Sequence, residues 1–515
     1  MQKKPRPLVL ILDFGSQYTQ LIARRVREAG VYCEVRPYDL PRRELARLAP
    51  RALILSGSPQ SAAAPNAYHF DPTVLDPKVP LLGICYGMQV SLFALGAALR
   101  KAKHSEYGQV TVEVEPSDVL FRGLPRRFKA WMSHGDELAS LPPGFAATAR
   151  TANCTLAGAR HVTRPWHFVQ FHPEVVHTPV GQALLGNFLF KVARLKPDWK
   201  IEDFLAEQVT ALRRQVGKGR VVCGLSGGVD SSVVAVLLHR AVGDRLTCLF
   251  VDHGLLRKDE GDEVVRALAG PLGVKIVRVD ARRRFLRALA GVSDPERKRK
   301  IIGREFIRVF EAEARKLGRV DFLAQGTLYP DVIESASIGK GAHVIKSHHN
   351  VGGLPARMRM KLVEPVRTLF KDEVRRLGRA LGLPAALVDR HPFPGPGLAV
   401  RILGPIEEED LAILREADAV FIGELRKSGL YGKVWQAFAV LLPVRTVGVM
   451  GDARTYDRVV ALRAVTSQDG MTADWARLPH AFLGRVSNRI VNEVRGVNRV
   501  VYDVSSKPPA TIEWE

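Results

Sequence analysis

Residues 221–232 have the sequence VVCGLSGGVDSS. An apolar, strand-like run passes directly into a loop of serines and glycines, and an apolar, helix-like run from Val229 to Val242 follows at once. Glycines let a backbone approach a ligand closely, and the N–H groups at the start of a helix attract phosphate. The pattern therefore predicts a strand–loop–helix unit that holds a phosphate or pyrophosphate group.

The side chains of this loop suit the same ligand. Serines supply hydroxyl donors, and Asp230 is placed to hold a cation such as Mg²⁺. The lysine of a Walker P-loop is missing. The sequence SGGVDSS resembles the loop of the ATP pyrophosphatases, which split ATP into AMP and pyrophosphate while adenylating an acceptor. The resemblance implies Mg²⁺ bound with ATP, no organic prosthetic group, and ATP or pyrophosphate contacts at Ser226, Gly227, Gly228, Val229, Asp230, Ser231 and Ser232.

Strand-like and helix-like runs alternate in two series along the chain. The first series has Leu8–Leu12, a helix to Gly30, Val31–Val35 and Ala52–Leu55. The second has strand-like runs at 221–224, 246–251, 274–279 and 322–324. Such alternation is typical of a parallel sheet with helices on its faces. We therefore expect an α/β fold class with two parallel-sheet domains.

Two proline-containing segments divide these series. Residues 191–200 turn polar around a proline, and HPFPGPG at 391–397 can sustain neither a helix nor a central strand. A chain of 515 residues is long enough for several domains, each with its own core. We expect α/β domains at 1–195 and 196–391, and a smaller α+β domain at 392–515.

The formal charge of +23 attracts phosphorylated ligands. Because the basic residues are scattered, with only local clusters, we expect nucleotide substrates rather than a dedicated nucleic-acid partner. The five cysteines include no CxxC pair, so neither a disulfide framework nor a zinc site is indicated. The apolar run near Leu8 is too short for a signal peptide, and no run reaches membrane-spanning length. We expect a cytoplasmic protein with no membrane partner.

A second chemical motif lies in residues 81–87, LLGICYG. A buried strand ends in G-x-C-x-G, and a helix is predicted from there through Leu99. This is the pattern of a nucleophile elbow with Cys85 as the nucleophile. The flanking glycines permit a strained turn, and a helix N-terminus favours a thiolate. A cysteine in an apolar run is ordinarily a packing residue, so the assignment requires a base.

Residues 166–174, WHFVQFHPE, supply that base. The pattern predicts a strand ending in His-Pro-Glu, and residues i and i+2 of an extended segment share a face, so Glu174 can orient His172. The set of Cys85, His172 and Glu174 resembles the triad of the class I glutamine amidotransferases. In that family the cysteine attacks the side-chain amide of glutamine, ammonia leaves, and water hydrolyses the thioester.

The same resemblance implies further contacts in this domain. The oxyanion donors are the backbone N–H groups of Gly57 and Tyr86. This chain has Ser58 where the family has a second glycine, and serine restricts φ, so the sequence leaves open whether the oxyanion hole is preformed. The implied glutamine contacts, which by pattern alone are a helix residue and a polar loop, are Gln89, Ser133, His134, Gly135 and Asp136.

A glutaminase and an ATP pyrophosphatase in one chain, in this order, resemble the glutamine-hydrolysing GMP synthase family over nearly the full length. The resemblance implies that ATP adenylates xanthosine 5′-monophosphate (XMP) at its C2 oxygen and that ammonia from glutamine displaces AMP to give GMP. It also implies a homodimer formed through the C-terminal domain, a lid at 345–353, and a pyrophosphate contact at Lys371. The implied XMP contacts are Arg284, Gln436, Asp452, Arg454, Lys507 and Glu513.

Three other interpretations fit part of the sequence. A tRNA-thiolating or tRNA-lysidine enzyme uses a pyrophosphatase loop and suits the basic charge, but it needs no glutaminase. An asparagine synthetase pairs glutaminase with adenylation, but its nucleophile is an N-terminal cysteine, and Gln2 follows Met1 here. A nucleotide-binding regulator with inactive sites requires losses at key positions, and none is found. We therefore expect a ligase that forms C–N bonds with glutamine as the amido donor.

Overall fold

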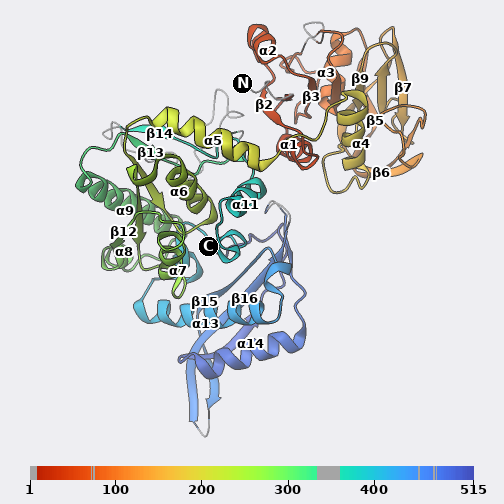
Figure 1. Ribbon diagram of the computed structural model, residues 1–515. Coiled ribbons are helices and arrows are strands. Elements are labelled where there is room, and N and C mark those ends of the chain that lie inside the picture. The colour runs from red at the N-terminus through yellow and green to blue at the C-terminus, as the bar shows by residue number, and fades with distance from the viewer. Residues whose placement is uncertain are drawn as a thin grey trace. The chain divides into compact units, whose positions relative to one another are not determined.

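The computed structural model describes residues 8–70, 72, 76–332, 360–450, 453–467, 470 and 472–515 (Figure 1). The chain falls into two compact units. The first comprises Met1–Asp203 with Tyr329–Ala342, and the second comprises Phe204–Leu328 with His343–Glu515. In the described ranges, no helix is both long enough and apolar enough to cross a membrane.

A nine-stranded sheet forms the first unit, in the order β2-β1-β3-β4-β9-β8-β7-β5-β6. Its first five strands are mutually parallel, which confirms the predicted α/β arrangement. They are β2 (Cys33–Pro37), β1 (Val9–Asp13), β3 (Ala52–Leu55), β4 (Leu81–Ile84) and β9 (Trp166–Val169). All except the edge strand β2 are buried along their whole length, as is usual in a parallel sheet.

The sheet continues with antiparallel strands that the sequence pattern did not predict. They are β8 (Gly158–His161), β7 (Phe145–Arg150), β5 (Leu99–Val114) and β6 (Arg127–Leu138). The predicted helix through Leu99 is wrong at its end, because helix α3 (Tyr86–Ala94) stops earlier and Leu99 begins β5. Between them Gly96 adopts a φ of 101°, a conformation that ends helices.

Short helices complete the first unit. They are α1 (Thr19–Glu28), α2 (Arg42–Leu48), α3, α4 (Gly181–Gly186) and a π-helical segment at Asn187–Val192. The polar segment at 191–200, which was expected to divide the two series, packs onto this unit. The N–H of Trp199 donates to the carbonyl of Gly30 (2.9 Å), and the guanidinium of Arg27 lies 4.6 Å from the Trp199 ring.

Five parallel strands form the larger sheet of the second unit, in the order β12-β11-β10-β13-β14. They are β12 (Ile276–Asp280), β11 (Leu246–Asp252), β10 (Val221–Leu225), β13 (Phe322–Ala324) and β14 (Lys361–Val363). The first four of these lie where the sequence predicts strands. Because β10 is central, the loop after it lies in the middle of the carboxyl edge, where such sheets bind ligands.

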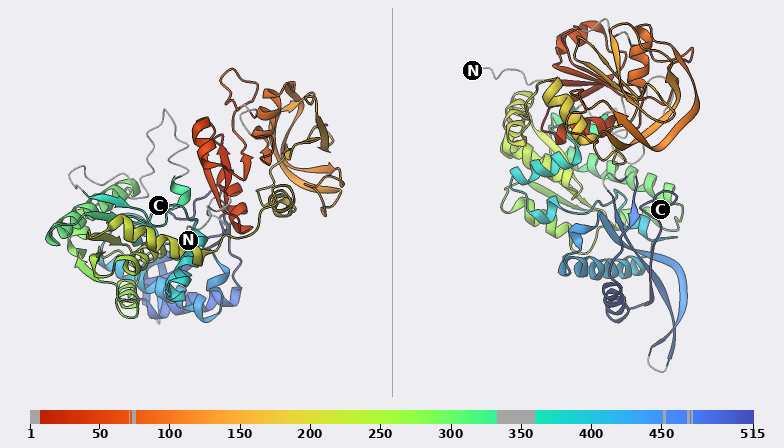
Figure 2. Two further views of the ribbon diagram at one scale, coloured as in Figure 1. Left: turned by 45° about the horizontal axis from the view of Figure 1, so that its top comes forward. Right: turned by 90° about the vertical axis from the view of Figure 1, so that its right-hand side faces the viewer.

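Helices flank this sheet in Figures 1 and 2. They are α5 (Ile201–Val216), α6 (Val229–Val242), α7 (Glu260–Ala269), α8 (Arg282–Leu289), α9 (Pro295–Lys316) and α11 (Lys371–Ala380). Helix α9 begins with an N-cap, in which Asp294 accepts the N–H of Arg297 (2.7 Å), followed by a proline at its first position.

The remaining elements form the predicted α+β part. A four-stranded sheet consists of β15 (Gln436–Met450), β16 (Ala453–Thr466), β17 (Asp474–Trp475) and β18 (Val497–Tyr502), and it packs with α13 (Glu408–Lys427) and α14 (His480–Glu493). The short helix α12 (Ala385–Val388) packs against α11. The β15–β16 hairpin projects beyond α13 and α14 (Figures 1 and 2).

One apolar core joins both sheets of the second unit. Val251 and Phe285 from the parallel-sheet part belong to the same cluster of buried side chains as Leu414, Phe421 and Val460 from the C-terminal part. The ranges 196–391 and 392–515, expected from the sequence as separate domains, thus share a core within one compact unit.

Candidate active sites

Cys85 lies at the junction of β4 and α3. Its φ of 52° and ψ of −107° are strained for an L residue, as in a nucleophile elbow. Glycines are needed on both sides, because a Cβ at Gly83 would lie 2.6 Å from the ring of Phe168 and a Cβ at Gly87 would lie 2.6 Å from Leu55. The turn therefore places the thiol, on a residue that is 5% exposed, at the N-terminus of a helix.

The pattern predicted that His172 lies in a strand. The residue instead lies beyond the end of β9. β9 stops at Val169, and the N–H of His172 donates to the carbonyl of Trp131 (2.9 Å). The imidazole Nδ1 lies 2.7 Å from Oε1 of Glu174, and Tyr18 packs edge-on against the imidazole with 5.1 Å between ring centroids. The expected contact between His172 and Glu174 is therefore present although the strand is shorter.

Burial and charge compete at this pair. His172 is 2% exposed, and Glu174 is fully buried. Burial by itself lowers the pKa of His172, but the negative charges of Glu174 and Cys85 and the hydrogen bonds to them raise it, so the pKa lies well above its usual value. The histidine is thus placed to hold a proton between carboxylate and thiol, an arrangement that activates a nucleophile.

Two further groups contact the sulfur of Cys85. The carbonyl oxygen of Ser133 lies 3.7 Å from Sγ, and Nε2 of Gln170 lies 3.6 Å from it. The N–H of Cys85 donates to the carbonyl of Val169 (2.8 Å), so the end of β9 supports the elbow. Gln170 was not predicted from the sequence, although it stands two residues before His172 in the same segment.

Four of the five expected glutamine contacts lie in strand β6 and not in a polar loop. They are Ser133, His134, Gly135 and Asp136. Gln89 lies in helix α3, as expected, and its Nε2 donates to the carbonyl of Asp136 (2.9 Å). The ring of His134 is buried, with Nε2 3.4 Å from Oε2 of Glu106. The structure thus brings these residues together on the side of the elbow where Ser133 contacts the sulfur.

Gly57 lies against the imidazole of His172. A Cβ at position 57 would be 3.1 Å from Cε1 of that ring, so the close approach favours glycine. The hydroxyl of Ser58 accepts the N–H of Gln60 (3.2 Å) and holds the following turn. Within the described residues, the N–H groups of Gly57 and Tyr86 donate to no protein acceptor. Both groups are therefore available to a ligand.

The Ser/Gly loop follows β10 and leads into α6, as predicted. Gly227 adopts a φ of 80°, and Gly228 is the N-cap residue of α6. No side chain of the described part of the chain caps this helix, so its first N–H groups are open to an anion. The hydroxyl oxygens of Ser226 and Ser231 lie 3.1 Å apart, and the hydroxyl of Ser232 donates to the carbonyl of Gly228 (2.9 Å).

Asp230 and Lys371 meet beside this loop. Nζ of Lys371, the first residue of α11, lies 2.5 Å from Oδ2 of Asp230. The other carboxylate oxygen, Oδ1, is buried and has no hydrogen-bond partner among the residues that the structure describes. A buried oxygen of this kind suits a cation, and Mg²⁺ is usually held by one or two carboxylates together with substrate phosphates. The described residues include no cluster of three potential metal-ligating side chains.

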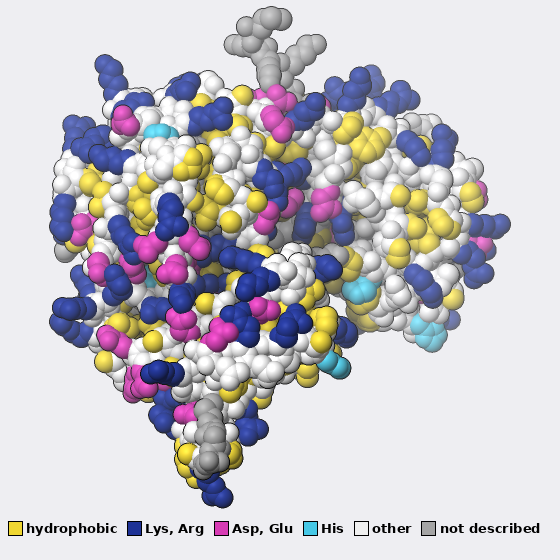
Figure 3. Space-filling view, turned by 60° about the horizontal axis from the view of Figure 1, so that its bottom comes forward, with side chains coloured by type: hydrophobic (Ala, Val, Ile, Leu, Met, Phe, Trp, Pro, Cys, Tyr) yellow, Lys and Arg dark blue, Asp and Glu magenta, His cyan; other side chains and the backbone are white. Residues whose placement is uncertain are grey.

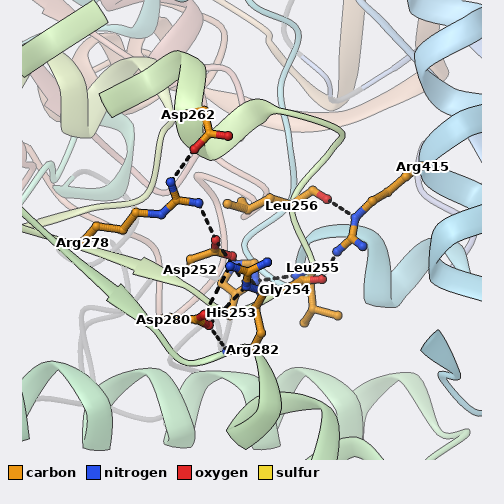
Figure 4. A network of polar contacts seen from close by, with 10 residues as sticks. All are labelled: Asp252, His253, Gly254, Leu255, Leu256, Asp262, Arg278, Asp280, Arg282 and Arg415. Atoms are coloured by element: carbon orange, nitrogen blue, oxygen red, sulfur yellow. Dashed lines mark hydrogen bonds and ion pairs between the residues drawn. The ribbon is translucent and has the colours of Figure 1, made fainter. Parts of the chain in front are cut away.

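Charged residues gather at the carboxyl ends of β11 and β12 (Figure 4). Arg278 donates to Asp252 (2.9 Å) and also pairs with Asp262. Arg282 pairs with Asp280 (3.1 Å). These residues were not predicted from the sequence, although aspartates that follow apolar strands mark the ligand-binding edge of a parallel sheet.

Arg415 of α13 links the C-terminal part of the chain to this edge (Figure 4). Its guanidinium donates to the carbonyls of Gly254 and Leu256 in the loop after β11, the latter at 3.1 Å. Burial lowers the pKa of His253, in the same loop, to about 4. The imidazole is therefore neutral near pH 7, and the loop is fixed by hydrogen bonds to α13.

Two of the expected XMP contacts lie side by side. Nε2 of Gln436 donates to Oε1 of Glu513 (2.6 Å). The same carboxylate accepts two hydrogen bonds from Arg401, a fully buried residue that was not predicted. Lys507 lies in the same C-terminal segment, where its Nζ donates to the carbonyl of Gly470 (2.8 Å).

The other expected XMP contacts are not part of this cluster. Arg284 of α8 pairs with Glu305 (2.8 Å). Arg454 pairs with Val449 near the tip of the β15–β16 hairpin. Asp452 and the predicted lid at 345–353 lie outside the described residues.

Fully buried basic side chains hold the end of the chain. Nζ of Lys298 lies 2.6 Å from Oε2 of Glu515, and Arg463 donates to Asp503 (2.7 Å) and to the carbonyl of Thr511 (2.9 Å). No sequence signal marks them, because their burial depends on elements far apart in the chain. On the face shown in Figure 3, in contrast, Lys and Arg side chains are spread among acidic and apolar ones.

Three family models match this chain. The class-I glutamine amidotransferase model matches residues 10–192, the NAD synthase model matches 199–301, and the GMP synthase C-terminal domain model matches 423–514. Curated relatives match along nearly the whole chain. The GMP synthases [glutamine-hydrolyzing] of Sinorhizobium fredii, Carboxydothermus hydrogenoformans and Rhodopseudomonas palustris are 58%, 57% and 59% identical to it. Each alignment covers 98% of this chain and 98%, 99% and 95% of the respective relative.

The chain belongs to the glutamine-hydrolysing GMP synthase family. The family expected from the Cys85 and SGGVDSS motifs is therefore confirmed. Because these GMP synthases match over the full length, the tRNA-modifying and asparagine synthetase interpretations are not favoured.

Proposed function

We propose that this chain makes GMP from XMP, with glutamine as nitrogen donor and with ATP cleaved to AMP and pyrophosphate. One observation carries the proposal. The chain that assembles Cys85, His172 and Glu174 around a strained elbow also presents an uncapped helix N-terminus behind a Ser/Gly loop. A glutaminase and an ATP-dependent adenylating site in one GMP synthase family member together account for a ligase that forms a C–N bond.

The glutaminase half acts through the elbow. The thiolate of Cys85 attacks the side-chain carbonyl carbon of glutamine, and the oxyanion is stabilised by the N–H groups of Gly57 and Tyr86. His172, held by Glu174, gives its proton to the departing ammonia. It then takes a proton from the water that hydrolyses the thioester to glutamate, which restores the cysteine. The glutamine contacts are Gln89, Ser133, His134, Gly135 and Asp136.

The synthetase half acts at the carboxyl edge of the parallel sheet. Residues 226–232 bind the β- and γ-phosphates of ATP with backbone N–H groups and hydroxyls, and Lys371 binds the pyrophosphate. The C2 oxygen of XMP attacks the α-phosphorus, and pyrophosphate leaves. Ammonia then attacks C2, and AMP leaves with that oxygen. A Mg²⁺ ion, held by Asp230 together with the phosphates, would neutralise charge on the departing pyrophosphate.

The XMP site draws on the C-terminal part of the chain. Gln436 and Glu513 already share a hydrogen bond, and Lys507 is a cation in the same segment. A lysine suits a 5′-phosphate, and a glutamate accepts from ribose hydroxyls or ring N–H groups. Arg284, Asp452 and Arg454 complete the proposed set.

A homodimer formed through the C-terminal domain reconciles two of these assignments. In the β15–β16 hairpin, Gln436 pairs with Val465 at one end and Arg454 pairs with Val449 near the other. Residues 454 and 465 are therefore about 35 Å apart along the strand. One nucleotide cannot span that distance, so Arg454 reaches XMP only in the site of a partner subunit.

Exposed apolar side chains on the hairpin support the same dimer. Val447, Val449 and Tyr456 are 50%, 74% and 59% exposed. Apolar side chains grouped in this way are typical of a protein–protein contact.

Mixed dimers of Arg454→Ala and Glu513→Gln chains test the assignment. One site per mixed dimer should be intact, so mixing restores synthase activity that neither variant has alone. Failure of dissociated and reassociated chains to complement would contradict it.

The nitrogen source separates the two halves experimentally. Cys85→Ala removes the glutamine nucleophile but leaves the synthetase half untouched. The variant should make GMP from ATP, XMP and ammonium at mildly alkaline pH at a near wild-type rate, and make essentially none from glutamine. Loss of both activities in a folded Cys85→Ala protein would show that the cysteine is structural.

We also place the protein in the cytoplasm and keep the proposed domain boundaries of 1–195, 196–391 and 392–515.

A further inference from the structure

Two buried amide side chains lie next to the sulfur of Cys85. Gln170 is 1% exposed and Gln89 is 4% exposed. Nε2 of Gln170 lies 3.6 Å from Sγ of Cys85, and its Oε1 lies 3.1 Å from Nε2 of Gln89. Nε2 of Gln89 in turn lies 2.9 Å from the carbonyl oxygen of Asp136. The amides thus connect a main-chain carbonyl to the nucleophile.

The carbonyl of Asp136 determines the direction of every hydrogen bond in this chain of contacts. A main-chain carbonyl can only accept, so the amide end of Gln89 that faces it must be the NH₂ group. That NH₂ group has a second N–H, which reaches Gln170, so Gln170 must present its oxygen there. The NH₂ group of Gln170 is then left facing Cys85. The group of Gln170 that faces the sulfur is therefore a hydrogen-bond donor. This conclusion does not depend on which terminal atom of either amide is assigned as nitrogen.

A donor at this position opposes the effect of Ser133. The carbonyl oxygen of Ser133, 3.7 Å from Sγ, accepts from a neutral thiol and repels a thiolate. The N–H of Gln170 has the opposite preference, because hydrogen bonds to an ionised acceptor are stronger than those to a neutral one. In the described part of the chain, the titratable groups that face the sulfur are His172 and, behind it, Glu174. Gln170 is uncharged, so its N–H is available as a donor at every pH.

We propose that Gln170 is a catalytic residue of the glutaminase reaction, whose side-chain N–H donates to the Cys85 sulfur and stabilises the attacking thiolate. The inference rests on the proposed role of Cys85 as the nucleophile. Gln170 takes and gives no proton; its donor stabilises negative charge on the attacking sulfur and lies beside the sulfur again when the thioester is hydrolysed. Gln89 fixes the side chain in the donating orientation.

Gln170→Glu tests the direction of the hydrogen bond. The substitution is isosteric, and one carboxylate oxygen still accepts from Gln89, while the other faces the sulfur with no proton to donate. We expect kcat for glutamine hydrolysis to fall about 10–100-fold, the range for a lost charge-assisted hydrogen bond, with little change in KM for glutamine. Alkylation of Cys85 by iodoacetamide, followed by mass spectrometry of its peptide, should slow, and its pH midpoint should move to higher pH.

Gln170→Met supplies a second variant that removes both ends of the amide. It should lower kcat less than Gln170→Glu, because it introduces no repulsive oxygen, and it should raise KM because Gln89 loses its acceptor. The control is Gln182→Glu, which changes an exposed glutamine of the same unit. Ammonia-dependent GMP synthesis should stay at the wild-type rate in all three proteins, which reports that each is folded.

Three outcomes would overturn the inference, and they are distinguishable. If alkylation of wild-type Cys85 abolishes glutamine-dependent synthesis but the alkylation profile and kcat of Gln170→Glu equal those of the wild type, Gln170 is not catalytic and the role of Cys85 stands. If alkylated wild-type protein still uses glutamine, Cys85 is not the nucleophile and both proposals fail. A rise in KM without a change in the pH midpoint would reduce Gln170 to a support for Gln89.

Discussion

Arg401 donates two hydrogen bonds to the carboxylate of Glu513, from Nε to Oε2 at 3.1 Å and from Nη2 to Oε1 at 2.9 Å. The guanidinium is fully buried, and its central carbon lies 4.1 Å from the ring centroid of Phe438 and 5.0 Å from that of Phe393. A positive charge buried among aromatic rings is stabilised by its carboxylate partner, here Glu513. The ion pair therefore fixes the position of Glu513, a proposed XMP contact.

Glu513→Ala should destabilise the protein by about 3–5 kcal/mol, because it leaves a buried guanidinium without its carboxylate. Urea denaturation of the second unit's transition measures this free energy of unfolding. Glu416→Ala is the matched control, since Glu416 pairs with Lys258 while both side chains are nearly half exposed, and it should cost no more than about 1 kcal/mol. Equal losses in the two variants would contradict the role assigned to the buried pair.

The pKa of His172 should fall in Glu174→Gln. In the wild type the charge of Glu174 helps to raise this pKa above its usual value, against the lowering effect of burial. A raised folded pKa contributes stability that is present below the unfolded value of about 6.5 and is lost as pH rises through the folded value. The stability difference between wild type and variant should therefore shrink as the pH rises above about 6.5.

Histidine-labelled NMR samples give the titration directly, and His172→Asn identifies the resonance. A midpoint for His172 that is the same in wild type and Glu174→Gln would show that the carboxylate does not control this proton. Glutamine-dependent synthesis should fall in Glu174→Gln, while ammonia-dependent synthesis should not change.

Lys371→Met should lower GMP synthesis from glutamine and from ammonia by the same factor. The proposed pyrophosphate contact loses a charge-assisted partner, so we expect a fall of about 10–100-fold in kcat. Arg376→Met is the matched control, because Arg376 lies in the same helix and both side chains are 45% exposed. The product in every case should be AMP with pyrophosphate. Formation of ADP, or a defect confined to glutamine, would refute the assignment.

Gly87→Ala should impair the elbow without affecting the synthetase half. The new Cβ would lie 2.6 Å from both Cβ and the carbonyl oxygen of Leu55, so the turn must shift. A shift of about 1 Å at a nucleophile can cost about 10²-fold in rate, and overpacking costs about 1–3 kcal/mol. Gly186→Ala is the control, because a Cβ there meets only Phe190, at 3.9 Å. Normal glutamine-dependent kinetics in Gly87→Ala would show that the turn tolerates a side chain.

The motifs whose residues lie close together in the chain were predictable from the sequence. The elbow around Cys85 and the loop at 226–232 each need a strand, a glycine-rich turn and a helix that are contiguous in the chain, so local pattern and turn chemistry suffice. The contact between His172 and Glu174 was predicted correctly for the same reason, although β9 ends earlier than expected. The helix predicted through Leu99 failed because its end depends on Gly96 and on the pairing of β5.

Sequence alone thus determined the fold class and the family and indicated the proposed nucleophile, because these rest on residues that are neighbours in the chain or periodic along it. Only the tertiary structure decided which distant side chains meet. It brought Lys371 to Asp230, 141 positions away, and Gln170 to the sulfur of Cys85, 85 positions away. It also placed the buried guanidinium of Arg401 against the carboxylate of Glu513. Such contacts depend on how strands are ordered in a sheet and on which charges find a partner inside it, and no local pattern encodes either.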